Sequence, residues 1–256
     1  IGNFFILGYG EDTGCVELNG ACGGSLFKNC AWIGNRGLRA TNSYYNRENG
    51  SNFRFQSAVA LFLSSASDTV DFENCTIAYN LMGSQKGAAG LIVNAGTANV
   101  KNSIIYGNVI FKGAMSWIED PDVAITGANG ILNLTNTLTT KYAEGILSIK
   151  GDPSFVTSLS EFYDCIKSTV SDPISSVEPT KALYKDEALD TVINLDVHLR
   201  SADGYFDNSG KYYPKGSTDV TSIAIDAGAV DSDYSKEPMP NGGVVNLGCY
   251  GNTPEA

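Results

Sequence analysis

Three acidic residues form the densest acidic run ahead of the C-terminal part of the chain: Glu119, Asp120 and Asp122, close to Trp117. Two carboxylates set across a groove can cleave a glycosidic bond, and an aromatic ring beside them can stack on a sugar. The three acids are therefore candidate catalytic groups, and Trp117 is a candidate ligand-binding residue. The alternative interpretation is a solvated turn around Pro121, because proline and aspartate are common in turns.

A second candidate site is a polar stretch that combines arginine with tyrosine. Arginine supplies charge and tyrosine supplies a ring for stacking, so the two together can bind acidic sugars. The alternative is a flap that protects a sheet edge. The residues concerned are Arg36, Arg39, Tyr44, Tyr45, Arg47 and Arg54.

Four acids near the end of the chain, Asp226, Asp231, Asp233 and Glu237, are candidate oxygen ligands for Ca²⁺. Their spacing is not that of an EF-hand, and the alternative is that they cap turns in a loop rich in glycine and proline. No other cofactor is expected. The single histidine, His198, is expected to be a hydrogen-bonded structural residue rather than a catalytic one.

Composition narrows the classes of partner. The chain has 256 residues and a formal net charge of −11, which argues against a nucleic-acid partner, because phosphate binding needs clustered lysine and arginine. The chain has no apolar run of about 18 residues, so no transmembrane segment is expected. Glycine is abundant, and β-branched and aromatic residues dominate the periodic stretches of the first 150 residues. This pattern favours strands joined by turns.

A seven-residue sequence phrase recurs in the first half of the chain. It predicts the strands and turns on which the candidate site residues would be held. It opens and closes on asparagine, its second residue is small and its fourth is large and apolar. Another apolar residue stands three positions before the second residue. The phrase is absent from 109–150, where further, less regular coils are expected. Its copies are 29–35, 74–80 and 102–108.

Such a repeat predicts a solenoid of stacked parallel coils. Neighbouring strands then lie about 4.8 Å apart, with equivalent residues directly above one another. A bend at the first asparagine should place it in the left-handed backbone region, and stacked asparagine side chains can hydrogen-bond along the column. Two apolar ladders are predicted, namely Phe27, Phe72 and Val100, and Trp32, Ile77 and Ile105.

We expect one domain with two parts. Residues 1–150 form the β-helix coils, with a loop excursion at about 38–56. Residues 151–256 contain C-terminal coils, short helices and a loop-rich terminal segment. Helical spacing from Phe155 to Ile166 predicts one helix, and a second is predicted over 181–189.

Several phrases of the C-terminal part form a series. They are Ala-Ile-Asp-Ala-Gly at 224–228, Pro-Asn-Gly-Gly at 240–243 and Asn-Leu-Gly-Cys-Tyr-Gly at 246–251, preceded by Asp-Pro-Ser-Phe at 152–155 and His-Leu-Arg at 198–200. This series resembles the C-terminal segment of bacterial secreted right-handed parallel β-helix proteins of the pectin-lyase-like superfamily. The asparagine repeats are also similar, more distantly, to those of polymorphic outer-membrane adhesins.

The resemblance implies an all-β, right-handed parallel β-helix. It also implies a secreted or cell-surface bacterial setting. Members of the superfamily include lyases, hydrolases and epimerases, and also adhesins without known catalysis, so the fold alone does not settle function. The catalytic signatures of alginate epimerases and pectate lyases have no convincing match in the chain.

We therefore expect a non-catalytic protein that acts in adhesion, glycan binding or surface or filament assembly, with a polysaccharide or cell-surface glycan as partner. The alternative is a polysaccharide lyase or glycoside hydrolase, or the C-terminal part of one. The N-terminal cap usual in the fold is not visible before Ile1. An uncapped end would expose a row of strand edges, so end-to-end self-association is also expected.

Overall fold

The computed structural model describes residues 4–7, 13–39, 56–82, 88–111, 117–118, 122–140, 146–170, 195–239 and 241–256. These residues are mostly strand with very little helix. The first strands are β1 (Phe4–Leu7), β2 (Thr13–Gly20), β3 (Ser25–Lys28), β4 (Ala31–Ile33), β5 (Arg36–Arg39), β6 (Gln56–Leu63), β7 (Thr69–Glu73), β8 (Thr76–Ala78) and β9 (Leu81–Met82). The later elements are β10 (Leu91–Lys101), β11 (Ile104–Tyr106), β12 (Val109–Phe111), β13 (Trp117–Ile118), β14 (Val123–Thr139), β15 (Ile146–Lys150), α1 (Leu159–Val170), β16 (Gly204–Phe206) and β17 (Tyr212–Pro214).

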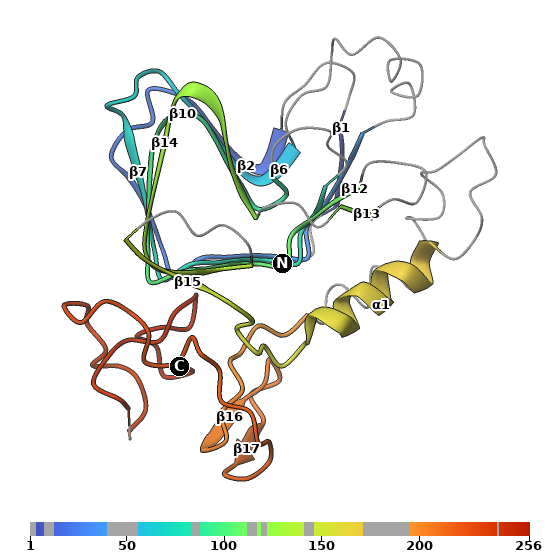
Figure 1. Cartoon of the computed structure of the whole chain (residues 1–256), viewed down its shortest axis with the longest axis vertical. Coiled ribbons are helices and arrows are strands. Elements are labelled where there is room, and N and C mark those ends of the chain that lie inside the picture. The colour runs from blue at the N-terminus through green and yellow to red at the C-terminus, as the bar shows by residue number, and fades with distance from the viewer. Residues whose placement is uncertain are drawn as a thin grey trace.

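Parallel pairing between successive coils builds one large curled sheet. Its first wall contains β2, β6 and the first half of β10, its second contains β3, β7 and the second half of β10, and its third contains β4, β8 and β11. The long strand β14 follows β10 and β11, and β15 pairs with its last part. The sheet curls through about 260° around an axis (Figure 1).

A smaller sheet continues the coils beyond the third wall. Its strands β1, β5, β9 and β12 are parallel, as the solenoid prediction requires. The last strand, β13, departs from this rule because it pairs antiparallel with β12.

The predicted vertical registry is confirmed. Phe27 is the register partner of Phe72, and Phe72 is the partner of Val100, all in parallel strands. The rings of Phe27 and Phe72 stack with centroids 5.2 Å apart and an interplanar angle of 13°. The second predicted column is also in register: Trp32, Ile77 and Ile105.

The corner between the second and third walls is turned by asparagine, as predicted. Asn29, Asn74 and Asn102 have φ angles of 52°, 51° and 51°, in the left-handed region that asparagine tolerates better than most residues. Asn136 has a φ of 45° and occupies the same corner of the fourth coil, in register with Asn102. The asparagine repeat was expected to be absent from 109–150. This expectation is wrong for the first residue of the repeat, since Asn136 occupies that position. Its apolar fourth position is lost, because Thr139 stands there.

The third wall is buried on both sides. Its inner face contributes Ile77 and Ile105 to the core inside the curled sheet. Its outer face contributes Tyr79 to a second core, which contains Phe155 and Phe162 from the C-terminal part of the chain. The Tyr79 ring stacks on Phe162 at 4.8 Å. The C-terminal segment thus covers the outside of this wall rather than hanging free of it (Figure 1).

The helix predicted from Phe155 to Ile166 is confirmed in part as α1, which begins at Leu159. Phe155 lies before it and forms an isolated antiparallel bridge with Leu199. The N-terminus of α1 has a capping box, in which Glu161 Oε2 accepts hydrogen bonds from the backbone N–H and the hydroxyl of Ser158, each at 2.7 Å. The second predicted helix, 181–189, lies outside the described residues. Among the helices that the structure describes, none has the length and apolar character that crossing a membrane would require.

Candidate functional site

The closing asparagines of the repeat form a hydrogen-bonded ladder in the protein interior. Asn80 Oδ1 accepts hydrogen bonds from the backbone N–H and the Nδ2 of Asn35, at 3.0 and 2.8 Å. Asn108 Oδ1 accepts from the same two groups of Asn80, at 3.2 and 2.7 Å. Bonding between stacked asparagines was predicted for the opening column, where Asn102 Nδ2 donates to Asn74 Oδ1 at 3.4 Å. The closing column, for which it was not predicted, has the shorter bonds.

Asp122, a candidate catalytic residue, is the last member of this ladder. Its Oδ1 accepts from the N–H and Nδ2 of Asn108, at 3.0 and 2.9 Å, and its Oδ2 accepts from Thr140 N–H at 2.9 Å. The side chain is 1% exposed, and burial raises its pKa although the Asn108 and Thr140 donors act in the opposite direction. A carboxylate suits this position because it only accepts hydrogen bonds and the ladder presents only donors.

The other residues of the first two candidate sites are described by their backbone alone or lie outside the described residues, so their roles stay predictions. Trp117 lies in β13, where the backbone alone is described, and Glu119 and Asp120 are outside the described residues. Arg36 and Arg39 are the first and last residues of β5, again described by their backbone. The remaining residues of the arginine and tyrosine stretch are also outside the described part: Tyr44, Tyr45, Arg47 and Arg54.

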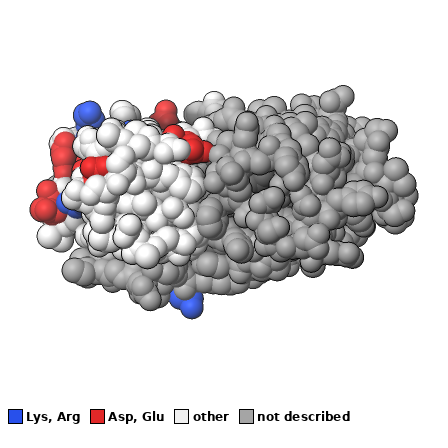
Figure 2. Space-filling view, turned by 90° about the horizontal axis from the view of Figure 1, so that it is seen from above, with Lys and Arg blue, Asp and Glu red and all other residues white. Residues whose placement is uncertain are grey.

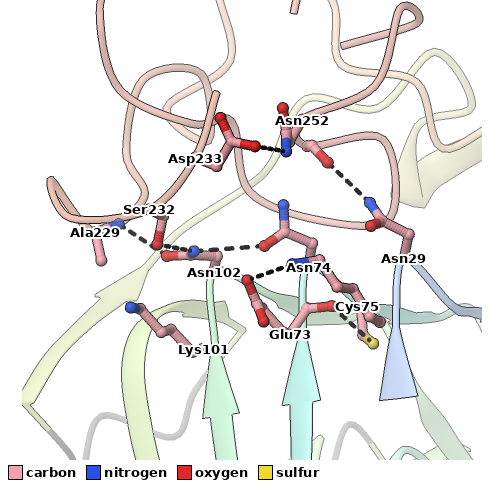
Figure 3. Close-up of polar contacts among 12 residues, drawn as sticks. Asn29, Glu73, Asn74, Cys75, Lys101, Asn102, Ala229, Ser232, Asp233 and Asn252 are labelled. Atoms are coloured by element: carbon pink, nitrogen blue, oxygen red, sulfur yellow. Dashed lines mark hydrogen bonds and ion pairs between the residues drawn. The ribbon is translucent and has the colours of Figure 1, made fainter. Parts of the chain in front are cut away.

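The four candidate Ca²⁺ ligands have different hydrogen-bond and ion-pair partners. Asp231 forms an ion pair with Lys101 at 3.0 Å. Asp233 accepts a hydrogen bond from Asn252 Nδ2 at 3.0 Å, as Figure 3 shows. Asp226 and Glu237 line a common cleft. Within the described residues no group of three or more histidine, cysteine, aspartate or glutamate side chains is arranged to hold a metal ion.

The opening asparagines of the repeat serve a different purpose, because they bind the C-terminal segment. Asn29 Nδ2 donates to the carbonyl oxygens of Cys249 and Gly251, at 3.0 and 2.8 Å. Thr76, the residue that follows the small position of the second repeat, accepts from Cys249 N–H through its hydroxyl oxygen at 2.9 Å. The end of the chain is thereby attached to the first two coils.

The same column attaches the start of this segment to the later coils. Asn102 Nδ2 donates to Ser232 Oγ at 2.8 Å, and Asn102 Oδ1 accepts from Ala229 N–H at 2.8 Å (Figure 3). Asn136 Nδ2 donates to the Ala227 carbonyl at 3.0 Å. The segment therefore runs along one corner of the curled sheet and is fixed at both ends, which gives its loops a rigid support.

The loops so supported enclose a cleft of about 320 Å³, which we call the His198 cleft. Its lining combines aromatic rings with carboxylates and amides, and it includes neither lysine nor arginine among the residues that the structure describes. The aromatic residues are Tyr205, Phe206, Tyr212 and Tyr250; the carboxylates are Asp203, Asp226, Glu237 and Glu255; the amides are Asn241 and Asn246.

His198 lies in the wall of the cleft and is oriented by Asp196. Asp196 Oδ1 lies 2.7 Å from His198 Nδ1, and Asp196 Oδ2 accepts from Asn208 N–H at 2.8 Å. Both side chains are buried. This contact with the Asp196 carboxylate fixes the orientation of the imidazole ring in the wall of the cleft. The nearest charged group to Nε2 is Glu255 Oε2 at 3.9 Å, beyond hydrogen-bonding distance.

Two aromatic groups complete the cleft. The Tyr250 ring stacks on the His198 ring at 3.8 Å and an angle of 14°. The antiparallel hairpin of β16 and β17 supplies three more rings, and Tyr205 is held by stacking on Tyr213 at 4.8 Å and 5°. Tyr212 on the same hairpin is 52% exposed, so one face of its ring is open to a ligand.

The two carboxylate oxygens of Glu237 are in different environments. Its Oε1 accepts from the backbone N–H groups of Asn246 and Asn252, both at 2.8 Å. Its Oε2 is buried and has no hydrogen-bond partner among the described residues. Burial raises the pKa of this carboxyl, and the nearby Asp226 acts in the same direction.

The interpretation of His198 as a hydrogen-bonded residue agrees with its contact to Asp196, but sequence reasoning missed the cleft around it. The cleft depends on contacts that His198 makes with Tyr250 and Glu255. Both of these residues are more than 50 positions away from His198 in the sequence. A signal was present in the C-terminal phrases, since four of the five contribute to its lining. The cleft residues from these phrases include His198, Asp226, Asn241, Asn246 and Tyr250.

These features define a class of protein: a curled parallel β-sheet whose C-terminal segment carries a concave site lined by aromatic and acidic groups. Comparison of the chain with models of known protein families, with curated proteins and with solved structures found no match.

Proposed function

We propose that the chain is a right-handed parallel β-helix of the pectin-lyase-like type. In this proposal it acts outside the bacterial cell, as a non-catalytic protein that binds a glycan in the His198 cleft. The observation that carries the proposal is the lining of the cleft, where open aromatic faces stand beside polar atoms of fixed orientation.

The chemistry of the lining matches that of a sugar. A pyranose has an apolar face that stacks on an aromatic ring and a rim of hydroxyl groups that hydrogen-bond. Tyr212 offers an exposed ring, and the Asp226 carboxylate offers acceptors for hydroxyl protons. The anchoring of the segment along the asparagine corner keeps these groups in place, so little ordering is required on binding.

The enzyme alternative is less well supported by the described residues. A polysaccharide lyase needs a base together with positive charge that neutralises a uronate. The part of the cleft lining that the structure describes has carboxylates instead of lysine or arginine. A glycoside hydrolase needs two free carboxyl groups. Three of the four cleft carboxylates are already engaged: Asp203 pairs with Lys215, Asp226 accepts from Gly242 N–H, and Glu237 Oε1 accepts from two backbone N–H groups.

The proposal predicts oligosaccharide binding that depends on Tyr212. In a glycan array followed by calorimetric titration, Tyr212→Ala should weaken binding about tenfold, because a stacking ring is lost. Tyr234→Ala is the control, since Tyr234 is partly exposed but does not line the cleft. An absence of oligosaccharide binding would contradict the proposal. So would release of reducing ends or new ultraviolet absorbance from a polysaccharide that is abolished in His198→Ala.

A specific observation also favours end-to-end self-association. Among the described residues, β2, β3 and β4 each pair on one side alone, and Leu26 on β3 is 58% exposed. An unpaired strand edge is a template for another chain, and lysine on an edge blocks such pairing. Light scattering should show a mass that rises with concentration, and Leu26→Lys should reduce the rise. A constant monomeric mass over a wide concentration range would refute this expectation.

A further inference from the structure

We infer that the His198 cleft selects glycans that carry protonated amino groups, in the manner of glucosamine oligomers, over uronic-acid polymers. This inference rests on the proposed glycan binding and specifies the chemical class of the ligand. It concerns a different site from the arginine and tyrosine stretch, for which binding of acidic sugars stays a prediction.

The first support is the charge of the cleft. Of its four carboxylates, Asp203 is paired with Lys215 at 2.5 Å. Asp226 accepts a hydrogen bond from Gly242 N–H at 3.0 Å, and no cation pairs with it among the described residues. Glu255 faces His198 and is largely exposed. Carboxylates without cationic partners leave the cleft negative, and the chain as a whole has a net charge of −11.

The second support is independent of charge and concerns hydrogen-bonding capacity. Glu237 is 5% exposed and lines the cleft, and its Oε2 is buried without a hydrogen bond among the described residues. A buried polar atom without a partner is costly, so a ligand that supplies a donor to this oxygen gains free energy.

The two observations point to the same ligand. An ammonium group has three donors and no acceptor, whereas a uronate carboxylate has acceptors only. A cleft whose described lining has carboxylates but neither lysine nor arginine therefore complements the first and repels the second. The open ring of Tyr212 adds a face on which a cation is favoured, so charge and stacking act together on an amino sugar.

The test compares three ligands of equal length by calorimetric titration at low salt: glucosamine oligomers, N-acetylglucosamine oligomers and oligogalacturonates. We expect the glucosamine oligomer to bind about tenfold more tightly than its N-acetylated form, and the oligogalacturonate to bind least. Glu255→Gln should reduce the preference several-fold, because it removes a largely exposed negative charge from the lining of the cleft. Asp226→Asn is the second variant, since asparagine tolerates the left-handed backbone that Asp226 adopts, with φ of 53°.

Asp219→Asn is the matched control, because Asp219 is exposed and outside the cleft. Equal affinity for the free and N-acetylated oligomers, or tighter binding of the oligogalacturonate, would overturn the inference while leaving glycan binding intact. Failure of every oligosaccharide in the wider array would instead remove the proposed function, so the two failures are distinguishable.

Discussion

Replacing Asn80 by alanine is expected to lower the free energy of unfolding by about 3 kcal/mol. Asn80 is fully buried and stands in the middle of the interior ladder. Its oxygen accepts from Asn35, and its Nδ2 also donates to the Trp32 carbonyl at 2.9 Å. Alanine would leave the Asn35 N–H and the Trp32 carbonyl without these partners, away from water. Each such orphaned group costs about 1–3 kcal/mol.

A matched control is available on the outer surface of the same sheet. Asn133 Nδ2 donates to Asn99 Oδ1 at 2.9 Å, in a geometry similar to the interior ladder, but Asn133 is exposed. Asn133→Ala should therefore change stability by less than about 0.5 kcal/mol, because water replaces the lost bond. Urea unfolding followed by circular dichroism measures both variants. Equal losses at the two positions would show that burial is not what makes the ladder strong.

Sequence reasoning identified the coils because a parallel solenoid converts a sequence repeat into spatial registry. Residues of one class at one repeat position must lie over one another, so Phe27, Phe72 and Val100 identified the interior without any tertiary information. The corner at Asn29 followed from the same logic, because a change of side-chain parity within three residues requires a bend.

The repeat signal failed where the periodic pattern weakened. Asn136 turns the fourth coil like its three predecessors, but Thr139 stands where the earlier copies have a large apolar residue, so the phrase was not recognised. Asp122 was interpreted as a turn residue or a catalytic acid. Its place at the end of the asparagine ladder depends on a segment that returns after an interruption of the coil, and no spacing rule encodes that return.

The cleft was beyond sequence reasoning for a different reason. Its walls come from loops whose mutual position is set by the asparagine corner, not by a repeat. The Asn29 bonds to the end of the chain join residues more than 200 positions apart. A single sequence without a repeat in that region has no information on such contacts, so Tyr250 and Glu255 could not be placed beside His198 in advance.

Asp122→Ala is expected to lower the free energy of unfolding by about 3 kcal/mol, and Asp122→Asn by about 1–2 kcal/mol. Alanine removes the acceptor for Asn108 and for Thr140 N–H together. Asparagine keeps one oxygen for Asn108 but turns an amide toward Thr140 N–H, so two donors face each other. Asp71→Ala is the control, because Asp71 is a half-buried acid that accepts from Asn99 Nδ2 at the surface.

The pH dependence of the unfolding free energy separates the effect of the charge of Asp122 from the effect of its shape. Because burial raises the pKa of Asp122, the folded state binds the proton more tightly than the unfolded chain. The contribution of this group to stability is then complete below its unfolded pKa and is lost as pH rises through the folded pKa. Subtracting the unfolding free energy of Asp122→Asn from that of the wild type at each pH isolates this loss. If this difference in unfolding free energy instead grows with rising pH, the three N–H donors lower the pKa of Asp122 by more than burial raises it. An Asp122→Asn protein that keeps its stability but loses turnover of a polysaccharide would restore the catalytic role that its position in the ladder argues against.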